Sequence, residues 1–235
     1  VFPLLWNAPN GETAMGYREE GYFPEAFINM LALLGWNPGT EQELFTMEEL
    51  IEAFSLEKVS KSGARFSHDK AKWFNAQYMK KADDKSLAPG LQKMLSEKGI
   101  DTTLERAEKA VSLIKERATF PADLLGLTLY MFEAPMQYDE KSVNKFWKSD
   151  NVSKLIELRE QLAKEEAIVA SETEPRIHDW VVANQYSMGQ LMNTLRIAIL
   201  GVSQGPSIFD ICEFIGKEEA LQRIDKAIEA LGAGK

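Results

Sequence analysis

Apolar residues recur every three or four positions along most of this chain, and that period predicts α-helices. Phe27, Leu31 and Leu34 form one such set. Pro24 precedes them at the first-turn position that proline favours, and Gly35 follows as a natural stop. We therefore expect a helix between Pro24 and Gly35.

Polar start signals predict further helices. Thr46 with Glu49, and Thr102 with Glu105, have the spacing of a capping box, in which each side chain binds a free backbone N–H of the first turn. Ser67 is expected to begin another helix. The remaining helical patterns cover residues 121–132, about 151–166, about 175–200 and 217–231. Strand-like alternation is nearly absent outside the first six residues, so we predict an all-α protein without repeats.

Two interruptions suggest how the chain is organised. Residues 80–86, KKADDKS, are polar and turn-rich between two helical blocks, which favours a junction there. Residues 133–139 contain Pro135 and separate an apolar helix from an amphipathic one. We expect one domain over residues 1–80, a second over 81–235, and a sub-boundary within the second near 133–139.

Composition limits the function. The net charge of −9 argues against nucleic-acid binding unless a local basic face exists, because neutralising phosphates supplies most of that affinity. One short segment has such a cluster, made of Lys58, Lys61, Arg65, Lys70 and Lys72. A solvated charged surface is the usual explanation of such a cluster, so the cluster permits RNA binding without requiring it.

The sequence also indicates the cellular setting. No apolar run approaches the roughly 18 residues of a membrane span, so we expect no membrane contact. Cys212 is the one cysteine, which excludes an internal disulfide and fits a reducing cytoplasm. The opening VFPLLWNAPNGE has neither an initiator methionine nor a basic segment, and we interpret it as a cut inside a longer chain.

The search for catalytic chemistry finds none. His68 and His178 are far apart, and no histidine or cysteine has a metal-ligand partner three or four residues away. No glycine-rich phosphate loop and no nucleophile beside a base occurs. We therefore expect no catalytic residue, no metal and no cofactor in this chain.

Three long segments resemble the bacterial glutamyl-tRNA synthetase family. They are YREEGYFPEAFINMLALLGW (17–36), VSKSGARFSHDKAKWFNAQY (59–78) and LMNTLRIAILGVSQGPSIFDICEFIGKEEALQRIDKAI (191–228). The middle, 82–172, is loosely similar, and the opening FPLLWNAPNGE resembles an insertion in some bacterial branches. The resemblance implies that 1–80 is a small helical stem-contact domain with a remnant of the catalytic region. It implies that 81–235 is an elongated anticodon-binding region of two helical sub-bundles.

The resemblance also explains why no active site is found. In this family the HIGH-like motif and the KMSKS-type loop, which hold ATP, precede the segment that resembles residues 17–36. Val59-Ser60-Lys61-Ser62 looks like such a loop but follows that segment. The full-length enzyme uses ATP and Mg²⁺ to attach glutamate to its tRNA. This chain alone is expected to be inactive.

The resemblance assigns anticodon contacts to five residues. Arg117, in LIKERATF, matches the arginine that reads the last anticodon base, and Arg196, in TLRIAIL, matches the arginine for the first base. Gly205, Pro206 and Ile208 are expected to cradle the middle and first bases. Alternatives stay open: Arg117 as an exposed helix-end arginine favoured by the helix dipole, Arg196 in an internal salt bridge, and Gly205-Pro206 as plain turn chemistry.

Four further residues match the region that touches the inside of the tRNA: Lys61, Lys70, Lys72 and Trp73. Lys61 is equally interpreted as solvated, and Trp73 as core. The expected partner is glutamate tRNA, with no DNA and no membrane, and we expect a monomer. Two other functions stay open: a relaxed or glutaminyl-type synthetase segment, and a helical protein-interaction module without RNA binding.

Overall fold

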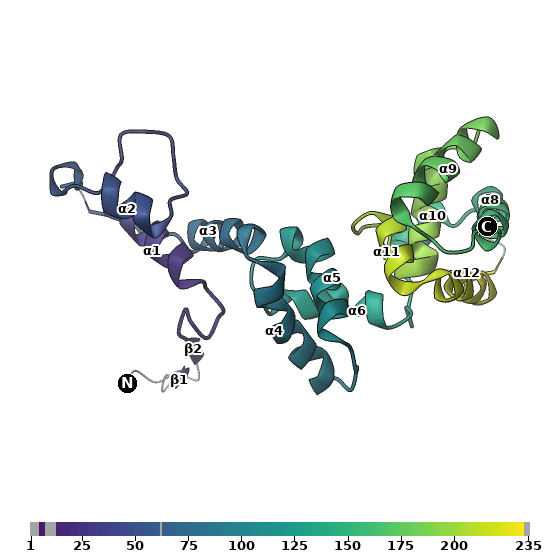
Figure 1. Cartoon of the computed structure of the whole chain (residues 1–235), viewed down its shortest axis with the longest axis horizontal. Coiled ribbons are helices and arrows are strands. Elements are labelled where there is room, and N and C mark those ends of the chain that lie inside the picture. The colour runs from purple at the N-terminus through teal and green to yellow at the C-terminus, as the bar shows by residue number, and fades with distance from the viewer. Residues whose placement is uncertain (1–4, 8–12, 62, 233–235) are drawn as a thin grey trace. The chain divides into compact units, whose positions relative to one another are not determined.

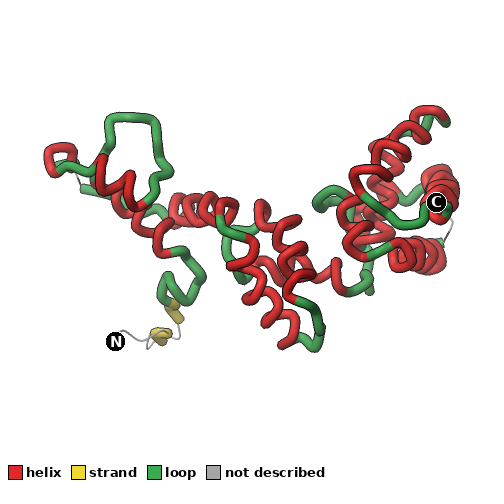
Figure 2. Tube along the Cα trace, viewed as in Figure 1, coloured by secondary structure: helices red, strands yellow, loops and turns green. Residues whose placement is uncertain are grey.

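The computed structural model describes residues 5–7, 13–61 and 63–232, and their regular structure is almost entirely helical (Figure 1, Figure 2). Within these residues, β structure is limited to the antiparallel pair β1 (Leu5–Asn7) and β2 (Thr13–Met15), and to one bridge between Trp36 and Val59. The prediction of an all-α protein is confirmed. The opening segment expected to be an insertion lies mostly outside the described residues.

The chain divides into two compact units, Val1–Leu127 and Thr128–Lys235. The helices of the first unit are α1 (Pro24–Gly35), α2 (Met47–Ala53), η1 (Leu56–Lys58), α3 (His68–Lys81), α4 (Asp84–Glu97), α5 (Leu104–Ile114) and η2 (Lys115–Arg117). Helix α6 (Asp123–Phe132) continues into the second unit. That unit contains α7 (Glu140–Phe146), α8 (Ser149–Ala163), α9 (Ala170–Ala183), α10 (Met188–Leu200), α11 (Ile208–Ile215) and α12 (Lys217–Leu231).

The predicted helix starts are confirmed at two positions and displaced at a third. Thr46 and Glu49 form the reciprocal capping box of α2, and Ser67 caps α3. At α5 the N-cap is Thr103, whose Oγ1 accepts from a backbone N–H at 3.2 Å, so the assignment of Thr102 was wrong. The carbonyl of Thr102 instead accepts from Gln92 Nε2 at 2.8 Å, which holds this residue outside the helix.

The predicted continuous helix over 175–200 was also wrong. The structure has α9 and α10 in its place, separated by a turn in which Gln185 has a φ of 58°. A positive φ cannot continue a right-handed helix. Pro175 lies inside α9 and not at its start. Apolar spacing alone could not separate these helices because the period resumes on both sides of the turn.

Two buried asparagines organise the first unit. Asn75 of α3 accepts from the Phe23 N–H at 2.8 Å and donates to the Thr119 carbonyl at 2.6 Å. Asn29 of α1 donates to the Glu43 carbonyl at 3.0 Å and accepts from the Phe45 N–H at 2.9 Å. Both side chains are fully buried, so losing either would leave buried backbone groups unpaired.

These contacts also decide where the units divide. Lys115 donates to the Ala82 carbonyl and pairs with Asp84, both at 2.8 Å, so the junction after α3 is tied to η2. Together with the hydrogen bonds of Asn75, the Lys115 contacts connect α3, α4 and α5 within the same unit. The expected boundary near residue 80 therefore does not coincide with the division at Leu127 and Thr128. The assignment of 1–80 and 81–235 to two RNA-contacting domains stays a prediction.

The second unit is built around α8, α10 and α12, which pack against one another (Figure 1). Each of the three helices contributes fully buried side chains, among them Leu155, Leu158, Leu195 and Ile224. No helix in the described part of the chain is long and apolar enough to cross a membrane.

Candidate nucleic-acid interface

Arg117 lies on an exposed turn that is held on both sides. It ends η2, which directly continues α5. On one side Lys115 is fixed to the start of α4, as described above. On the other side the backbone N–H groups of Thr119 and Phe120 both donate to Asp123 Oδ2, at 2.9 and 2.8 Å. The predicted position of Arg117 at a helix end is confirmed, and its turn is rigidly supported.

Arg196 joins α10 to the loop that follows it. The helix ends at Gly201, which has a φ of 78°, a conformation that side chains rarely adopt. The chain then returns so closely that a Cβ on Gly205 would lie 3.5 Å from Arg196 Nη1. The half-buried guanidinium donates a hydrogen bond to the Pro206 carbonyl. The structure thus brings Arg196, Gly205 and Pro206 together in the second unit.

Pro206 within this loop and Ile208 just after it are both buried. Ile208 begins α11 and its side chain is 3% exposed, so it packs within the second unit. Ser207 caps the same helix. The Ile208 side chain is therefore not accessible to a base in this structure, and its predicted base contact stays a prediction.

A segment that sequence reasoning treated only as a sub-boundary supports the 201–207 loop. Asp139 donates its N–H to the Gly201 carbonyl at 2.8 Å. The hydroxyls of Ser142 and Ser203 lie 2.9 Å apart. A Cβ on Gly201 would lie 2.6 Å from the Gln137 carbonyl oxygen. Residues 135–142 are therefore part of the scaffold of this site.

Arg223 is a supporting residue that the sequence did not reveal. Its side chain is 2% exposed, and Nη1 donates to the carbonyls of Ile199 at 3.1 Å and Tyr130 at 2.6 Å. Nε donates to Glu219 at 2.7 Å. Arg223 thus satisfies carbonyls in the last turns of both α10 and α6, and fixes the end of α10 from which the loop departs.

The residues assigned to the tRNA stem lie on α3 and in the segment that precedes it. Lys72 and Lys61 are exposed, and Lys70 pairs with Glu43 at 2.8 Å. Trp73, left open between core and surface, is 41% exposed, while its neighbour Phe74 is fully buried. Because Glu43 offsets the charge of Lys70, Lys72 has the stronger attraction for an anion.

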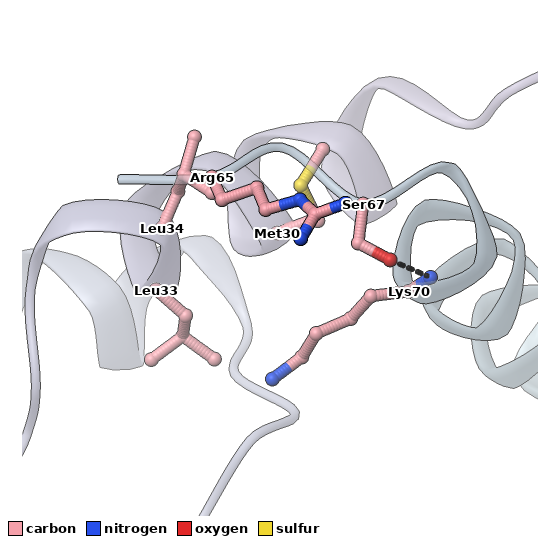
Figure 3. Close-up of a pocket in the computed structure, with 6 residues that line it drawn as sticks. All are labelled: Met30, Leu33, Leu34, Arg65, Ser67 and Lys70. Atoms are coloured by element: carbon pink, nitrogen blue, oxygen red, sulfur yellow. Dashed lines mark hydrogen bonds between the residues drawn. The ribbon is translucent and has the colours of Figure 1, made fainter. Parts of the chain in front are cut away.

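Arg65, which the site assignment did not include, shares a pocket with Lys70. The pocket is lined by Met30, Leu33 and Leu34, with Ser67 beside the two cations (Figure 3). Figure 3 shows the long side chains of Arg65 and Lys70 extending along it. The described residues contain no group of three or more His, Cys, Asp or Glu able to hold a metal ion.

Comparisons with known proteins identify the family of this chain. Residues 68–228 match the family model "Anticodon binding domain", and residues 11–73 match "tRNA synthetases class I (E and Q), catalytic domain". The chain belongs to this anticodon-binding family of the class I tRNA synthetases for glutamate and glutamine. More particularly, it matches the C-terminal part of bacterial glutamate–tRNA ligase, so the resemblance stated from the sequence is confirmed.

The individual relatives share substantial identity. The chain is 46% identical over 233 residues to the glutamate–tRNA ligase of Porphyromonas gingivalis, covering 99% of this chain and 46% of the relative. For the ligase of Flavobacterium johnsoniae the identity is 47% over 231 residues, with 98% and 46% covered. The crystal structure of a glutamate tRNA ligase from Elizabethkingia meningosepticum, in complex with its amino acid, superposes with a TM-score of 0.86 at 43% identity. That match covers 98% of this chain and 46% of that one. The chain thus spans about half the length of these relatives.

Proposed function

We propose that this chain binds glutamate tRNA and reads its anticodon, within a longer enzyme that attaches glutamate in an ATP- and Mg²⁺-dependent reaction. The observation that carries the proposal is the contact of Arg196 with the 201–207 loop. A half-exposed arginine beside a rigid, glycine-bearing loop offers both hydrogen-bond donors and room for close approach. Unstacked bases are read by such groups along their edges.

Arg117 is proposed to select the last base of the anticodon. A glutamate anticodon ends in cytosine, whose edge presents acceptors at O2 and N3. A glutamine anticodon ends in guanine, which presents N–H donors there. Because arginine has only donors, it attracts cytosine. Its donors would face the N–H donors of guanine, which disfavours that base. The exposed, supported turn of Arg117 suits this role.

Lys61, Lys70, Lys72 and Trp73 are proposed to contact the tRNA away from the anticodon. Three of them are cations that face solvent, and Trp73 offers an aromatic surface beside them. These contacts position the RNA without reading its sequence. Their contribution is expected to decrease as salt is added, since it comes from displacing counterions.

The test is to measure binding of this chain to glutamate tRNA and glutamine tRNA across a salt series. We expect glutamate tRNA to bind more tightly than glutamine tRNA. The logarithm of the binding constant should fall linearly with the logarithm of the salt concentration. A DNA duplex of matched length serves as the control and is expected to bind weakly. If neither tRNA shows salt-dependent binding, the proposal fails for this chain.

Replacing Arg196 with alanine is expected to weaken glutamate tRNA binding by about 1–2 kcal/mol, the scale of one charged hydrogen bond. The fold should remain intact, because the guanidinium is half exposed and the Pro206 carbonyl can be hydrated. Binding isotherms and thermal melting measure the two effects. The matched control is Arg159→Ala, which removes a partly exposed arginine of the same unit. Loss of cooperative melting in Arg196→Ala would instead indicate a structural role.

A further inference from the structure

A small pocket with two cations at its edge lies beside the first turn of α3 (Figure 3). Its volume is about 190 Å³. The lining combines an apolar wall from α1 with polar side chains from the segment that enters α3: Met30, Leu33, Leu34, Arg65, Ser67 and Lys70. Pockets that hold a whole drug-sized ligand measure roughly 300–1,000 Å³, so this one suits one part of a larger molecule.

The polar side of the pocket is positively charged. The residues that line it, all within the described part of the chain, include two cations and no carboxylate. Both Arg65 and Lys70 are exposed, so both are accessible from solvent. The Arg65 guanidinium carries a planar set of N–H donors, which matches the oxygens of a phosphate. The pocket therefore favours an anionic group, with phosphate as the best geometric match.

Glu43 is the counter-ion of this pocket, and its backbone is fixed. Lys70 Nζ lies 2.8 Å from Glu43 Oε1, and both side chains are about half exposed. The Glu43 carbonyl accepts from Nδ2 of the buried Asn29 at 3.0 Å, which holds the main chain in place. An ion pair between exposed side chains contributes little stability, so an entering anion can replace Glu43 as the partner of Lys70.

The surroundings of the pocket favour an RNA backbone as the source of the anion. Lys72 and Trp73 follow on the same helix, and both are exposed. A nucleic acid brings a phosphate with every nucleotide, so one phosphate in the pocket leaves others for such neighbouring cations. Each phosphate is also joined to a ribose, whose carbon face suits the apolar wall formed by Leu33 and Leu34.

We propose that Arg65 and Lys70 bind a backbone phosphate of the tRNA in this pocket. The adjoining ribose lies against Leu33 and Leu34, and the phosphate displaces Glu43 from Lys70 as it enters. Glu43 thus competes with the RNA for a cation that the RNA needs. This phosphate site rests on the proposed tRNA binding, and it gives roles to Arg65 and Glu43.

The experiment measures how tightly this chain binds whole glutamate tRNA and the isolated anticodon stem-loop across a salt series. The variants are Arg65→Ala, Arg65→Lys and Glu43→Gln. Arg106→Ala is the matched control, because Arg106 is an exposed arginine of the same unit, on α5. Thermal melting of each variant checks that the fold is retained.

Arg65→Ala is expected to weaken binding of the whole tRNA about tenfold, the scale of one charged hydrogen bond. It should also reduce the salt slope by about 1, as the loss of one phosphate contact does. Arg65→Lys should recover part of the affinity, because lysine keeps the charge and lacks the planar donors.

Glu43→Gln is expected to act in the opposite direction. Binding of the whole tRNA should tighten about threefold, because Lys70 then has no competing carboxylate in an exposed ion pair. The hydrogen bond from Asn29 is made to the Glu43 main chain, so the substitution leaves it intact. Arg106→Ala should change neither affinity nor slope, and none of the four variants should alter binding of the anticodon stem-loop.

The results that contradict this site are distinct from those that contradict tRNA binding. If the wild-type chain binds the tRNA, and Arg65→Ala and Glu43→Gln bind it equally well, the phosphate site is wrong while the proposed function stands. If the wild-type chain binds neither RNA, both fail. AMP is titrated separately as a free nucleotide. AMP binding that depends on Arg65, with tRNA affinity unchanged in Arg65→Ala, would also overturn the proposal.

Discussion

Replacing Arg223 with methionine is expected to lower the free energy of unfolding of the second unit by about 3–5 kcal/mol, because it removes one partner of a buried, charged hydrogen-bond network. The guanidinium is buried and donates to the carbonyls of Ile199 and Tyr130. Both carbonyls lie in the last turn of a helix, where no backbone N–H is available to them. Methionine fills similar space but donates nothing, so the buried Ile199 carbonyl and the partly buried Tyr130 carbonyl lose their partner.

This loss of stability is measured by urea denaturation of the whole chain, with unfolding monitored through a signal from the second unit. Arg159→Met is the control, because Arg159 pairs with Asp225 in a partly exposed ion pair whose removal is expected to cost less than about 1 kcal/mol. Since Ile199 precedes the end of α10, Arg223→Met should also weaken tRNA binding through the 201–207 loop. Equal stability of the two variants would show that the buried guanidinium is not what holds α6, α10 and α12 together.

Replacing Arg117 with glutamine is expected to narrow the preference for cytosine over guanine at the end of the anticodon by about 1–3 kcal/mol, the worth of one good base contact. Glutamine carries both a donor and an acceptor, so it satisfies guanine as well as cytosine. The fold should be unaffected, because Arg117 is exposed and the turn is held by Lys115 and Asp123. The measurement is the ratio of affinities for two anticodon stem-loops that differ only in this base.

Arg106→Gln is the matched control for this prediction. Arg106 is an exposed arginine on the same helix, α5, at its opposite end. If the ratio is unchanged in Arg117→Gln, or changes in Arg106→Gln instead, Arg117 is not the base-reading residue. A wild-type chain with no preference between the stem-loops would favour a relaxed or glutaminyl-type segment.

The local signals of the sequence predicted most helix positions correctly. Lys217–Leu231 and Pro24–Gly35 agree with the predicted limits, because a single apolar stripe with clear ends defines each. The predictions were wrong where a distant or conformational effect intervened. Gln92 binds the Thr102 carbonyl and displaces the cap of α5, and the positive φ of Gln185 divides the helix predicted over 175–200.

Neighbouring residues with similar chemistry also show that local sequence does not decide which side chain is buried. Trp73 and Phe74 are both aromatic, and nothing in their local sequence decided which is buried. Successive residues on a helix point about 100° apart, and the packing of α3 against α1 turns Phe74 inward and leaves Trp73 at the surface. Arg196 and Pro206 are close in sequence, yet their contact depends on how Gly201 reverses the chain.

The sequence by itself determined that this chain is helical, where most helices begin, and that it resembles the tRNA-contacting part of a glutamyl-tRNA synthetase. These properties depend on spacing, caps and motifs, which are local. Only the tertiary structure decided which polar residues hold the candidate site in place. Asn75 reaches a carbonyl 44 residues away and Arg223 one 93 residues away. Such partners meet only after the helices have packed, and a buried hydrogen bond between them produces no periodic pattern in the sequence.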